Sequence, residues 1–251
     1  MDISSYPLSE AKEYYLKSLE MLIALAEETG MVGIRHDLSG SYIRLGATLN
    51  ALGEPSKAKG YYFKSLEIAE AVAEETGTVE AHRRLCVSYE KLGDILKAER
   101  KLSEAAEYYL KSLKIAEALA EETGTVQARR DLSISYNNLG NILKAGEKLS
   151  EAADYYLKSL KIRRALAEET GTVEARRDLS VSLERMGFIL KAEGKLSESV
   201  EYYLKSLEIR KALAEVIRSP EITDELSVCL YNMGVLYCKM GNTSEARKYA
   251  G

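Results

Sequence analysis

The chain repeats itself every 47 residues. The string AEETG occurs four times at this spacing, at 26–30, 73–77, 120–124 and 167–171. The string YYLKSL, with YYFKSL as one variant, recurs in the same register, at 14–19, 61–66, 108–113, 155–160 and 202–207. Constant spacing without insertions indicates one structural unit copied in tandem. The sequence therefore predicts a stacked array in which most residues serve to hold neighbouring copies together.

The composition favours helices throughout. Apolar residues make up 46% of the chain, only three residues are proline, and Ala, Leu, Glu and Lys dominate. This is the composition of a nearly all-helical chain that can bury a continuous core. The net charge of −4 and the isoelectric point near 5.6 argue against a general nucleic-acid binder, which would carry a large positive excess.

Three cysteines, Cys86, Cys229 and Cys238, fit neither a disulfide framework nor a paired metal-ligand spacing, which favours a reducing compartment. No apolar run approaches the roughly 18–20 residues that a membrane helix needs. The N-terminal residues MDISSYPLSE lack a basic segment followed by an apolar core, so no signal peptide is expected. We expect a cytoplasmic protein that does not bind membranes.

One copy, residues 125–171, shows how the unit is built. Its first half has apolar residues at helical spacing, and a Gly-Glu-Lys sequence then interrupts the pattern. Ser150 is expected to cap a second helix, whose first turn is acidic. Gly171 is expected to end that helix in a left-handed conformation, and Thr172 to cap the first helix of the next unit. We call the two kinds first-type and second-type helices.

The unit resembles the tetratricopeptide repeat (TPR) family. The resemblance rests on a Leu-Gly pair followed by apolar and small residues at the spacing of the family: Leu139, Gly140, Leu143, Ala152, Tyr156 and Ser159. Glycine at the helix crossing is expected to let two backbones approach, and the alanine to keep the helix pair close. The same set recurs in every copy, although the last copy is cut short.

The unit is longer than the family's unit of about 34 residues. The extra residues are expected to extend both helices to roughly 20–22 residues, or about 30 Å each. The resemblance implies an all-α fold, a right-handed α-α superhelix (solenoid) of antiparallel helix pairs, with about 10 full helices and a C-terminal stub. We expect one array over residues 1–251, with helices near 9–29, 32–52, 56–76, 79–99, 103–123, 126–146, 150–170, 173–193, 197–217, 222–240 and 244–250.

Neither end of the array has a polar capping helix. Residues 9–29 form a second-type helix with no first-type helix before it, and residues 244–250 begin another that stops early. Because solenoids need polar terminal helices, we expect a segment of a longer array, with a small protein with atypical ends as the alternative.

The resemblance implies that the first-type helices line a concave binding groove. Two basic ladders lie on the positions assigned to this groove. One contains Arg83, Arg130 and Arg177, and the other contains Lys97, Lys144 and Lys191. Both ladders could bind the carboxylates or phosphates of an acidic peptide. The alternative is that the arginines pair with the Glu-rich helix ends or with an acidic ladder, as structural surface charge. This ladder contains Asp37, Asp131, Asp178 and Glu225.

Other groove candidates are polar or aromatic. Asn137 and Asn141 lie one turn apart and could hold the backbone of an extended peptide, with ordinary surface asparagines as the alternative. The family's clamp for a terminal carboxylate, a Lys and an Asn one turn apart, is not matched. Phe188 and Tyr231 interrupt the polar pattern near the C-terminus and could form an apolar anchor, or else fill space against the next copy.

The sequence contains no recognisable catalytic constellation, glycine-rich phosphate loop or metal-ligand motif, so we expect no enzyme, no cofactor and no metal. The predicted function is a protein-protein interaction scaffold that binds a peptide or a helical segment in the groove. Two alternatives stay open. The chain could be a regulatory or sensor module of a larger signalling protein, or a solenoid that associates end to end with itself.

Overall fold

A computed structural model describes residues 8–249 of the chain. Its described residues form eleven α-helices and no strand, so the predicted all-α fold class is confirmed. The first-type helices are α2 (Val32–Ala51), α4 (Val79–Ala98), α6 (Val126–Ala145), α8 (Val173–Ala192) and α10 (Pro220–Lys239). The second-type helices are α1 (Leu8–Thr29), α3 (Pro55–Thr76), α5 (Leu102–Thr123), α7 (Leu149–Thr170), α9 (Leu196–Val216) and the short α11 (Thr243–Arg247). No helix in residues 8–249 is both long enough and apolar enough to span a bilayer.

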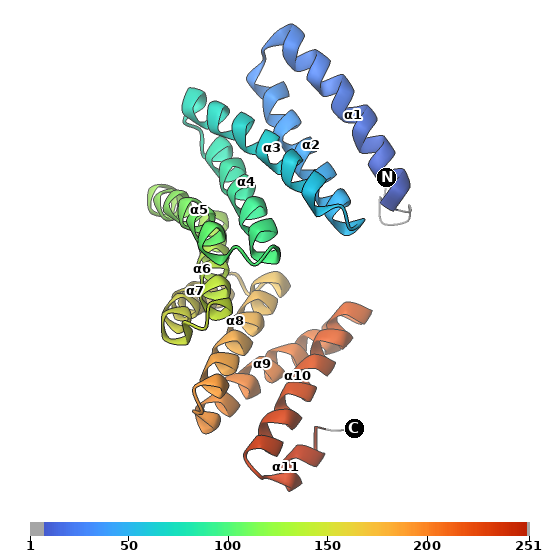
Figure 1. Cartoon of the computed structure of the whole chain (residues 1–251). Helices are drawn as coiled ribbons and strands as arrows, with labels where there is room; N and C mark the ends of the chain where they lie inside the picture. Colours follow the sequence, from blue (N-terminus) through green and yellow to red (C-terminus); the bar gives the residue numbers. More distant parts are fainter. Residues whose placement is uncertain (1–7, 250–251) are drawn as a thin grey trace. The chain divides into compact units, whose positions relative to one another are not determined.

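Internal contacts divide the chain into two compact units, Met1–Thr123 and Gly124–Gly251. Helices α1–α5 belong to the first unit and α6–α11 to the second. Within each unit, successive helices pack as antiparallel pairs joined by short turns (Figure 1). The single array over residues 1–251 stays a prediction, and its residues 1–7 and 250–251 lie outside the described part.

Most helix ends follow the repeat. Thr125 and Thr172 cap α6 and α8, since their hydroxyl oxygens accept from the amides three residues on, at 3.2 Å in both cases. Gly171 ends α7 with φ of 61°. The expected cap at Ser150 is wrong: α7 begins at Leu149, and its N-cap residue, Lys148, makes no side-chain cap bond. The preceding turn already sets the entry of the chain, because Glu147 adopts a left-handed φ of 61°.

The two C-terminal helices depart most from the expected bounds. Helix α10 begins at Pro220, two residues before the expected position, because Ser219 caps it by accepting from the amide of Ile222 at 3.4 Å. Proline fits the first turn, where its missing N–H has no partner to lose. Helix α11 ends at Arg247, and residue 250 of the expected stub lies outside the described part.

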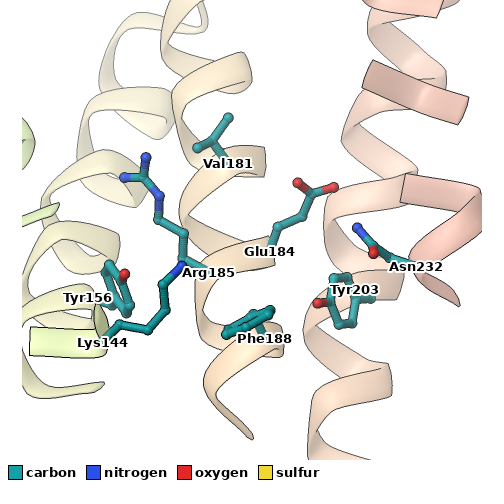
Figure 2. A pocket seen from close by; sticks show the side chains of 8 residues that line it. All are labelled: Lys144, Tyr156, Val181, Glu184, Arg185, Phe188, Tyr203 and Asn232. Carbon is teal, nitrogen blue, oxygen red and sulfur yellow. The ribbon is translucent and has the colours of Figure 1, made fainter. Parts of the chain in front are cut away.

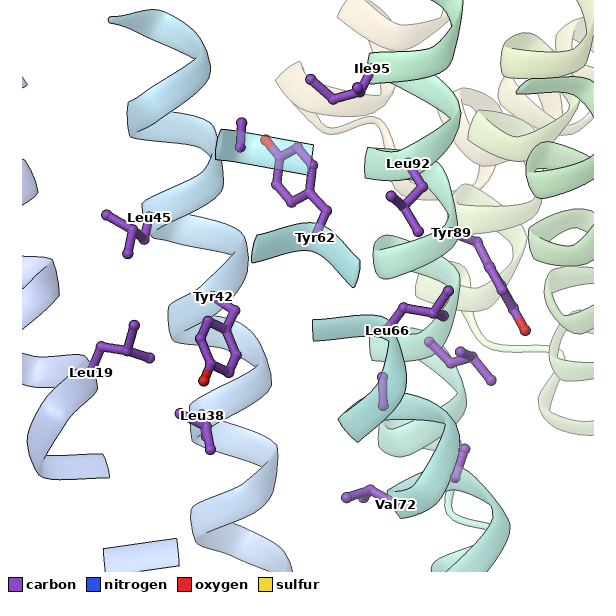
Figure 3. Close-up of a cluster of buried hydrophobic side chains, with 14 of the residues drawn as sticks. Leu19, Leu38, Tyr42, Leu45, Tyr62, Leu66, Val72, Tyr89, Leu92 and Ile95 are labelled. Atoms are coloured by element: carbon purple, nitrogen blue, oxygen red, sulfur yellow. The ribbon is translucent and has the colours of Figure 1, made fainter. Parts of the chain in front are cut away.

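The core of the first unit forms where a first-type helix meets the second-type helices on either side of it. Leu45 and Leu92 are fully buried, and Tyr62 is 3% exposed between them (Figure 3). Each Leu-Gly pair thus places its leucine in the core.

The glycine of the Leu-Gly pair makes room for a ring rather than for a second backbone. A Cβ atom at Gly46 would lie 2.5 Å from the Tyr62 ring, and one at Gly140 would lie 2.5 Å from the Tyr156 ring. The expectation of close backbone contact is therefore wrong, because the tyrosine of the following second-type helix occupies the space. The tyrosines are buried for the same reason, with Tyr156 only 1% exposed.

Candidate functional site: a cationic pocket on the second unit

The arginine ladder forms ion pairs between neighbouring first-type helices of the second unit. The Arg130 Nε atom donates to Asp178 at 2.8 Å, and its Nη1 atom lies 2.6 Å from Glu174. Arg177 pairs in the same way with Glu225. For these two arginines the structure shows the alternative interpretation, pairing with the acidic ladder. In the first unit, Arg83 lies 3.4 Å from Glu80 on its own helix.

The lysine ladder behaves differently in the second unit. Lys144 and Lys191 place their Nζ atoms 4.7 and 5.4 Å from the centroid of the Phe188 ring. Lysines at this distance from an aromatic face interact with its negative quadrupole. In the first unit, by contrast, Lys97 lies 3.5 Å from the carboxylate of Asp94. The structure therefore brings three predicted residues, Lys144, Phe188 and Lys191, into one cluster.

A pocket of about 210 Å³ opens beside this cluster, between helices α6 to α10 of the second unit (Figure 2). Its volume exceeds that of an engineered cavity of about 150 Å³ that takes up a benzene ring, so it has room for one peptide side chain. The Phe188 ring is 40% exposed, so it offers an apolar face to a ligand. The lining residues are Lys144, Tyr156, Val181, Glu184, Arg185, Phe188, Tyr203 and Asn232.

Arg185 has unused hydrogen-bonding capacity, as does the Oε1 atom of Glu184, which is buried without a hydrogen-bond partner among residues 8–249. Within residues 8–249 its guanidinium makes no hydrogen bond and has no carboxylate within ion-pair distance. Burial lowers the pKa of Arg185, because few polar groups replace the water that would solvate its charge. A guanidinium carries five donors in a planar fork, and it keeps its charge even when its pKa is lowered. The pocket therefore holds a partly buried cation whose charged form is favoured by the carboxylates of Asp178 and Glu184.

The carboxylate of the pocket is already engaged. The Glu184 Oε2 atom accepts from Arg210 Nη2 at 3.0 Å, and the Arg210 side chain is only 5% exposed. Burial raises the pKa of Glu184, although the neighbouring Arg210 opposes the shift. Figure 2 shows the Glu184 carboxylate directed towards α10, and the Arg185 guanidinium directed to the other side of α8. Glu184 therefore pairs with Arg210, and together with Asp178 it also favours the charged form of Arg185.

The two groove asparagines do not face a ligand in the way the sequence suggested. Asn137 is 2% exposed, and neither its amide nitrogen nor its amide oxygen has a hydrogen-bond partner within the described residues. Its placement as an exposed groove residue is therefore wrong in this structure. The Asn141 oxygen accepts from the Tyr156 hydroxyl at 2.8 Å, which ties that side chain to a wall of the pocket.

Tyr231 is 70% exposed on α10 and does not line the pocket, so the predicted pairing with Phe188 is not seen.

Arg185 was not among the predicted site residues, because it lies one residue away from the positions assigned to the groove. Its signal was the variation between copies: Arg44, Lys91, Asn138, Arg185 and Asn232 occupy this position.

Cys229 lies beside the Glu184–Arg210 pair and should be chemically inert. It is 0% exposed, and burial raises the pKa of its thiol to about 12. Alkylation needs the thiolate. At pH 8, iodoacetamide should therefore modify the exposed Cys238 in the native protein and leave Cys229 unmodified, as read by peptide mass spectrometry. Both should react in urea, and native labelling of Cys229 at the rate of Cys238 would contradict its placement.

The fold and the repeat define a helical-repeat protein. Models of the tetratricopeptide repeat family match residues 87–119, 133–169 and 182–213. The chain belongs to the tetratricopeptide repeat family, a class of protein-interaction scaffolds. No curated protein matches the sequence at a significant level.

Solved structures of TPR-like proteins have the same fold. BtubC (BKLC) from P. vanneervenii superposes with a TM-score of 0.76 at 20% identity, over 98% of this chain and 89% of that one. The apo form of RapI gives 0.63 at 13% identity, over 93% and 56% of the two chains. A protein from Podosopora anserina made of nearly identical TPR-like repeats gives 0.62 at 18% identity, over 86% and 92%. At these identities the likeness extends to the fold alone.

Proposed function

We propose that the first-type helices of the second unit bind an extended peptide or a helical segment of a partner protein, with the pocket beside Phe188 as the anchor. One observation carries the proposal: a half-exposed aromatic ring and a side-chain-sized pocket lie together on α8. Interfaces concentrate their binding energy in such pockets, where one partner side chain is fully desolvated.

The charges around the pocket favour a partner with acidic groups. Lys144 and Arg185 line the pocket and Lys191 lies 5.4 Å from the centroid of the Phe188 ring, while the carboxylate among the lining residues, Glu184, is bound to Arg210. The arginine ladder supports acidic partners less well, because Arg130 and Arg177 already have carboxylate partners. We therefore assign the preference for acidic groups to the lysine ladder and Arg185. Of the predicted groove residues, Lys144, Lys191 and Phe188 remain candidates for ligand contact.

The proposal predicts that Phe188→Ala weakens peptide binding about 3- to 8-fold. Burying a whole phenylalanine side chain contributes about 1.5–3 kcal/mol, and because Phe188 is 40% exposed, binding can bury about that share, or about 0.6–1.2 kcal/mol. The measurement uses an array of random extended peptides to select binders of the wild-type chain, followed by titration of the selected peptides with each variant.

The chain offers a matched control in its only other phenylalanine. Phe63 lies on α3 of the first unit and is 43% exposed, against 40% for Phe188. Phe63→Ala therefore removes the same side chain from a similar environment, and it should leave binding unchanged. Equal losses for Phe63→Ala and Phe188→Ala would refute the anchor.

A further inference from the structure

Helix α1 exposes a face that the other long second-type helices bury. Ser18 is exposed, whereas the serines at the same repeat position of α3, α5, α7 and α9 are fully buried. Leu25 is 39% exposed, whereas its counterpart in α3, Val72, is 2% exposed. In α3 this face lies against the preceding first-type helix, since the Ser65 hydroxyl lies 2.9 Å from that of Ser39 on α2. The exposed face of α1 is therefore the kind of surface that a first-type helix covers.

Helix α10 exposes the opposite half of the same contact. Ser227 is exposed, although it occupies the repeat position of Ser133 and Ser180, which are fully buried. The backbone carbonyls of Ser133 and Ser180 accept from the serine hydroxyl of the following second-type helix, at 2.9 Å in both cases. Tyr231 is 70% exposed, whereas its counterpart Asn137 is 2% exposed. The exposed face of α10 is therefore the kind of surface that a second-type helix covers.

A fixed register joins each first-type helix of the second unit to the second-type helix that follows it. The Ser206 hydroxyl donates to the Ser180 carbonyl, and Arg210 donates to the Glu184 carboxylate, and both bonds join residues 26 positions apart. The same spacing of 26 recurs one repeat earlier, between α6 and α7. The register therefore predicts which residue of a second-type helix would lie opposite each residue of α10.

This register pairs the face of α10 with that of α1 residue by residue. Helices α1 and α11 begin at residues 8 and 243, which are five repeats of 47 residues apart, so α1 of a second copy can continue the array of the first. Ser18 of the second copy then lies opposite Ser227, and Leu22 lies opposite Tyr231. Serine meets serine, as between α2 and α3, and two largely apolar side chains meet where α8 and α9 have an ion pair. The two exposed faces therefore match in chemistry as well as in position.

Helix α11 covers one end of α10, and α1 of a second copy can replace it. Helix α11 has five residues, and so short a helix is marginal by itself. Its sequence Ser-Glu-Ala recurs in α1, and Tyr14 occupies the repeat position of Tyr249, whose ring stacks on Tyr237 at 5.6 Å. Tyr15 adds the ring that packs against the Leu-Gly glycine in other copies, since position 250 has alanine instead. The exchange therefore keeps these contacts and extends them along α10.

We propose that the exposed face of α1 docks on α10 of a second copy of this chain, in the register of the repeat and in place of α11. The contact buries largely apolar surface on both sides, which drives association. It joins two different faces, and each copy carries both. Such a head-to-tail contact continues into longer assemblies or closes into a ring.

The first test measures mass by light scattering across a concentration series. The wild-type chain should rise above the monomer mass of 27.9 kDa as its concentration increases. Ser18→Arg places a long cation in the contact and should stay at the monomer mass, with an unchanged circular dichroism spectrum because Ser18 is exposed in the single chain. The control is Ser9→Arg, on the same helix at a position where the serine is exposed in every copy, and it should associate like the wild type.

The second test mixes two variants that are blocked on different faces. Ser227→Arg blocks the face on α10 and should also stay at the monomer mass. A mixture of Ser18→Arg and Ser227→Arg retains one intact pair of faces, so it should reach about twice the mass of the monomer and rise no further. A wild-type chain that stays monomeric at every concentration would overturn the proposal. So would association that survives either substitution, or a mixture that remains monomeric, because a different face would then join the copies.

Discussion

Replacing Gly140 with alanine should destabilise the second unit by about 2 kcal/mol, although alanine is the better helix former. The new Cβ atom would lie 2.5 Å from the Tyr156 ring, which is closer than non-bonded carbon atoms approach. The ring has little room to move, since Tyr156 is 1% exposed and its hydroxyl is bound to Asn141. Overpacking of this kind costs up to about 3 kcal/mol, and the helix propensity of alanine returns about 1 kcal/mol.

Gly234 provides the control for Gly140. It occupies the same repeat position in the last copy, but the nearest atoms to a Cβ there lie 3.8 Å away, on Ala246 and Tyr249. Gly234→Ala should therefore be neutral or raise the free energy of unfolding by up to about 1 kcal/mol. Urea unfolding followed by circular dichroism compares the two variants. A similar effect of both substitutions would show that the ring of Tyr156 does not restrict this position.

The repeat made the fold predictable from the sequence, because every copy shows the same pattern of apolar residues and helix ends. Thr172 as a cap and Gly171 as a stop follow from local backbone chemistry alone, and both are seen. The predicted cap at Ser150 is wrong because a serine before an acidic first turn does not fix the start of the helix. The left-handed turn at Glu147 decides where the helix begins. The role of Gly140 also required the structure, since only the packed Tyr156 ring shows what the missing Cβ makes room for.

The candidate site was less predictable, because it depends on which charges find partners. The sequence places Arg130 and Lys144 on the same face, but only the structure shows that Arg130 meets Asp178 while Lys144 meets Phe188. These pairings depend on how far each side chain extends from its helix, and the spacing of residues along one helix does not show this. Arg185 was missed because it lies one residue away from the positions assigned to the groove, although it lines the pocket.

Buried arginines in the second-type helices were missed because these helices were assigned to the scaffold. One position of the repeat is alanine in two copies, Ala69 and Ala116, and arginine in two others, Arg163 and Arg210. Both arginines are at least nine-tenths buried, at 6% and 4% exposure. A change from a small apolar residue to a buried cation within an otherwise constant helix was the signal in the sequence.

Replacing Glu184, the ion-pair partner of Arg210, with alanine should destabilise the second unit by about 3 kcal/mol or more. Arg210 is 4% exposed and its carboxylate partner is Glu184, at 3.0 Å. Removing one member of a buried pair leaves an uncompensated charge in the interior, at a cost of about 3–5 kcal/mol. Glu169→Ala is the control, because it breaks the exposed Arg129–Glu169 pair at 2.7 Å and should cost less than about 1 kcal/mol.

Other copies of the repeat indicate a second substitution that should restore the stability lost in Glu184→Ala. Arg210→Ala added to Glu184→Ala should recover most of the lost stability, because Ala69 and Ala116 are the residues that other copies use at this position. If the double variant is as unstable as Glu184→Ala alone, the buried charge is not the cause of the loss.

The reciprocal change is Asn137→Glu, which recreates the Glu184–Arg210 arrangement one repeat earlier, opposite Arg163. Among residues 8–249 the Arg163 side chain donates only to the Ser133 hydroxyl and the Asp178 carbonyl, both at 3.0 Å, and burial lowers its pKa to about 10. A carboxylate at position 137 would give this guanidinium an ionic acceptor, and it would replace an amide that has no partner within residues 8–249. The variant should therefore be more stable by about 1.5 kcal/mol, the contribution of a hydrogen bond to a charged group. A loss of stability in the same urea titration would show that this interface has no room for the longer side chain, and that Asn137 is there for its size.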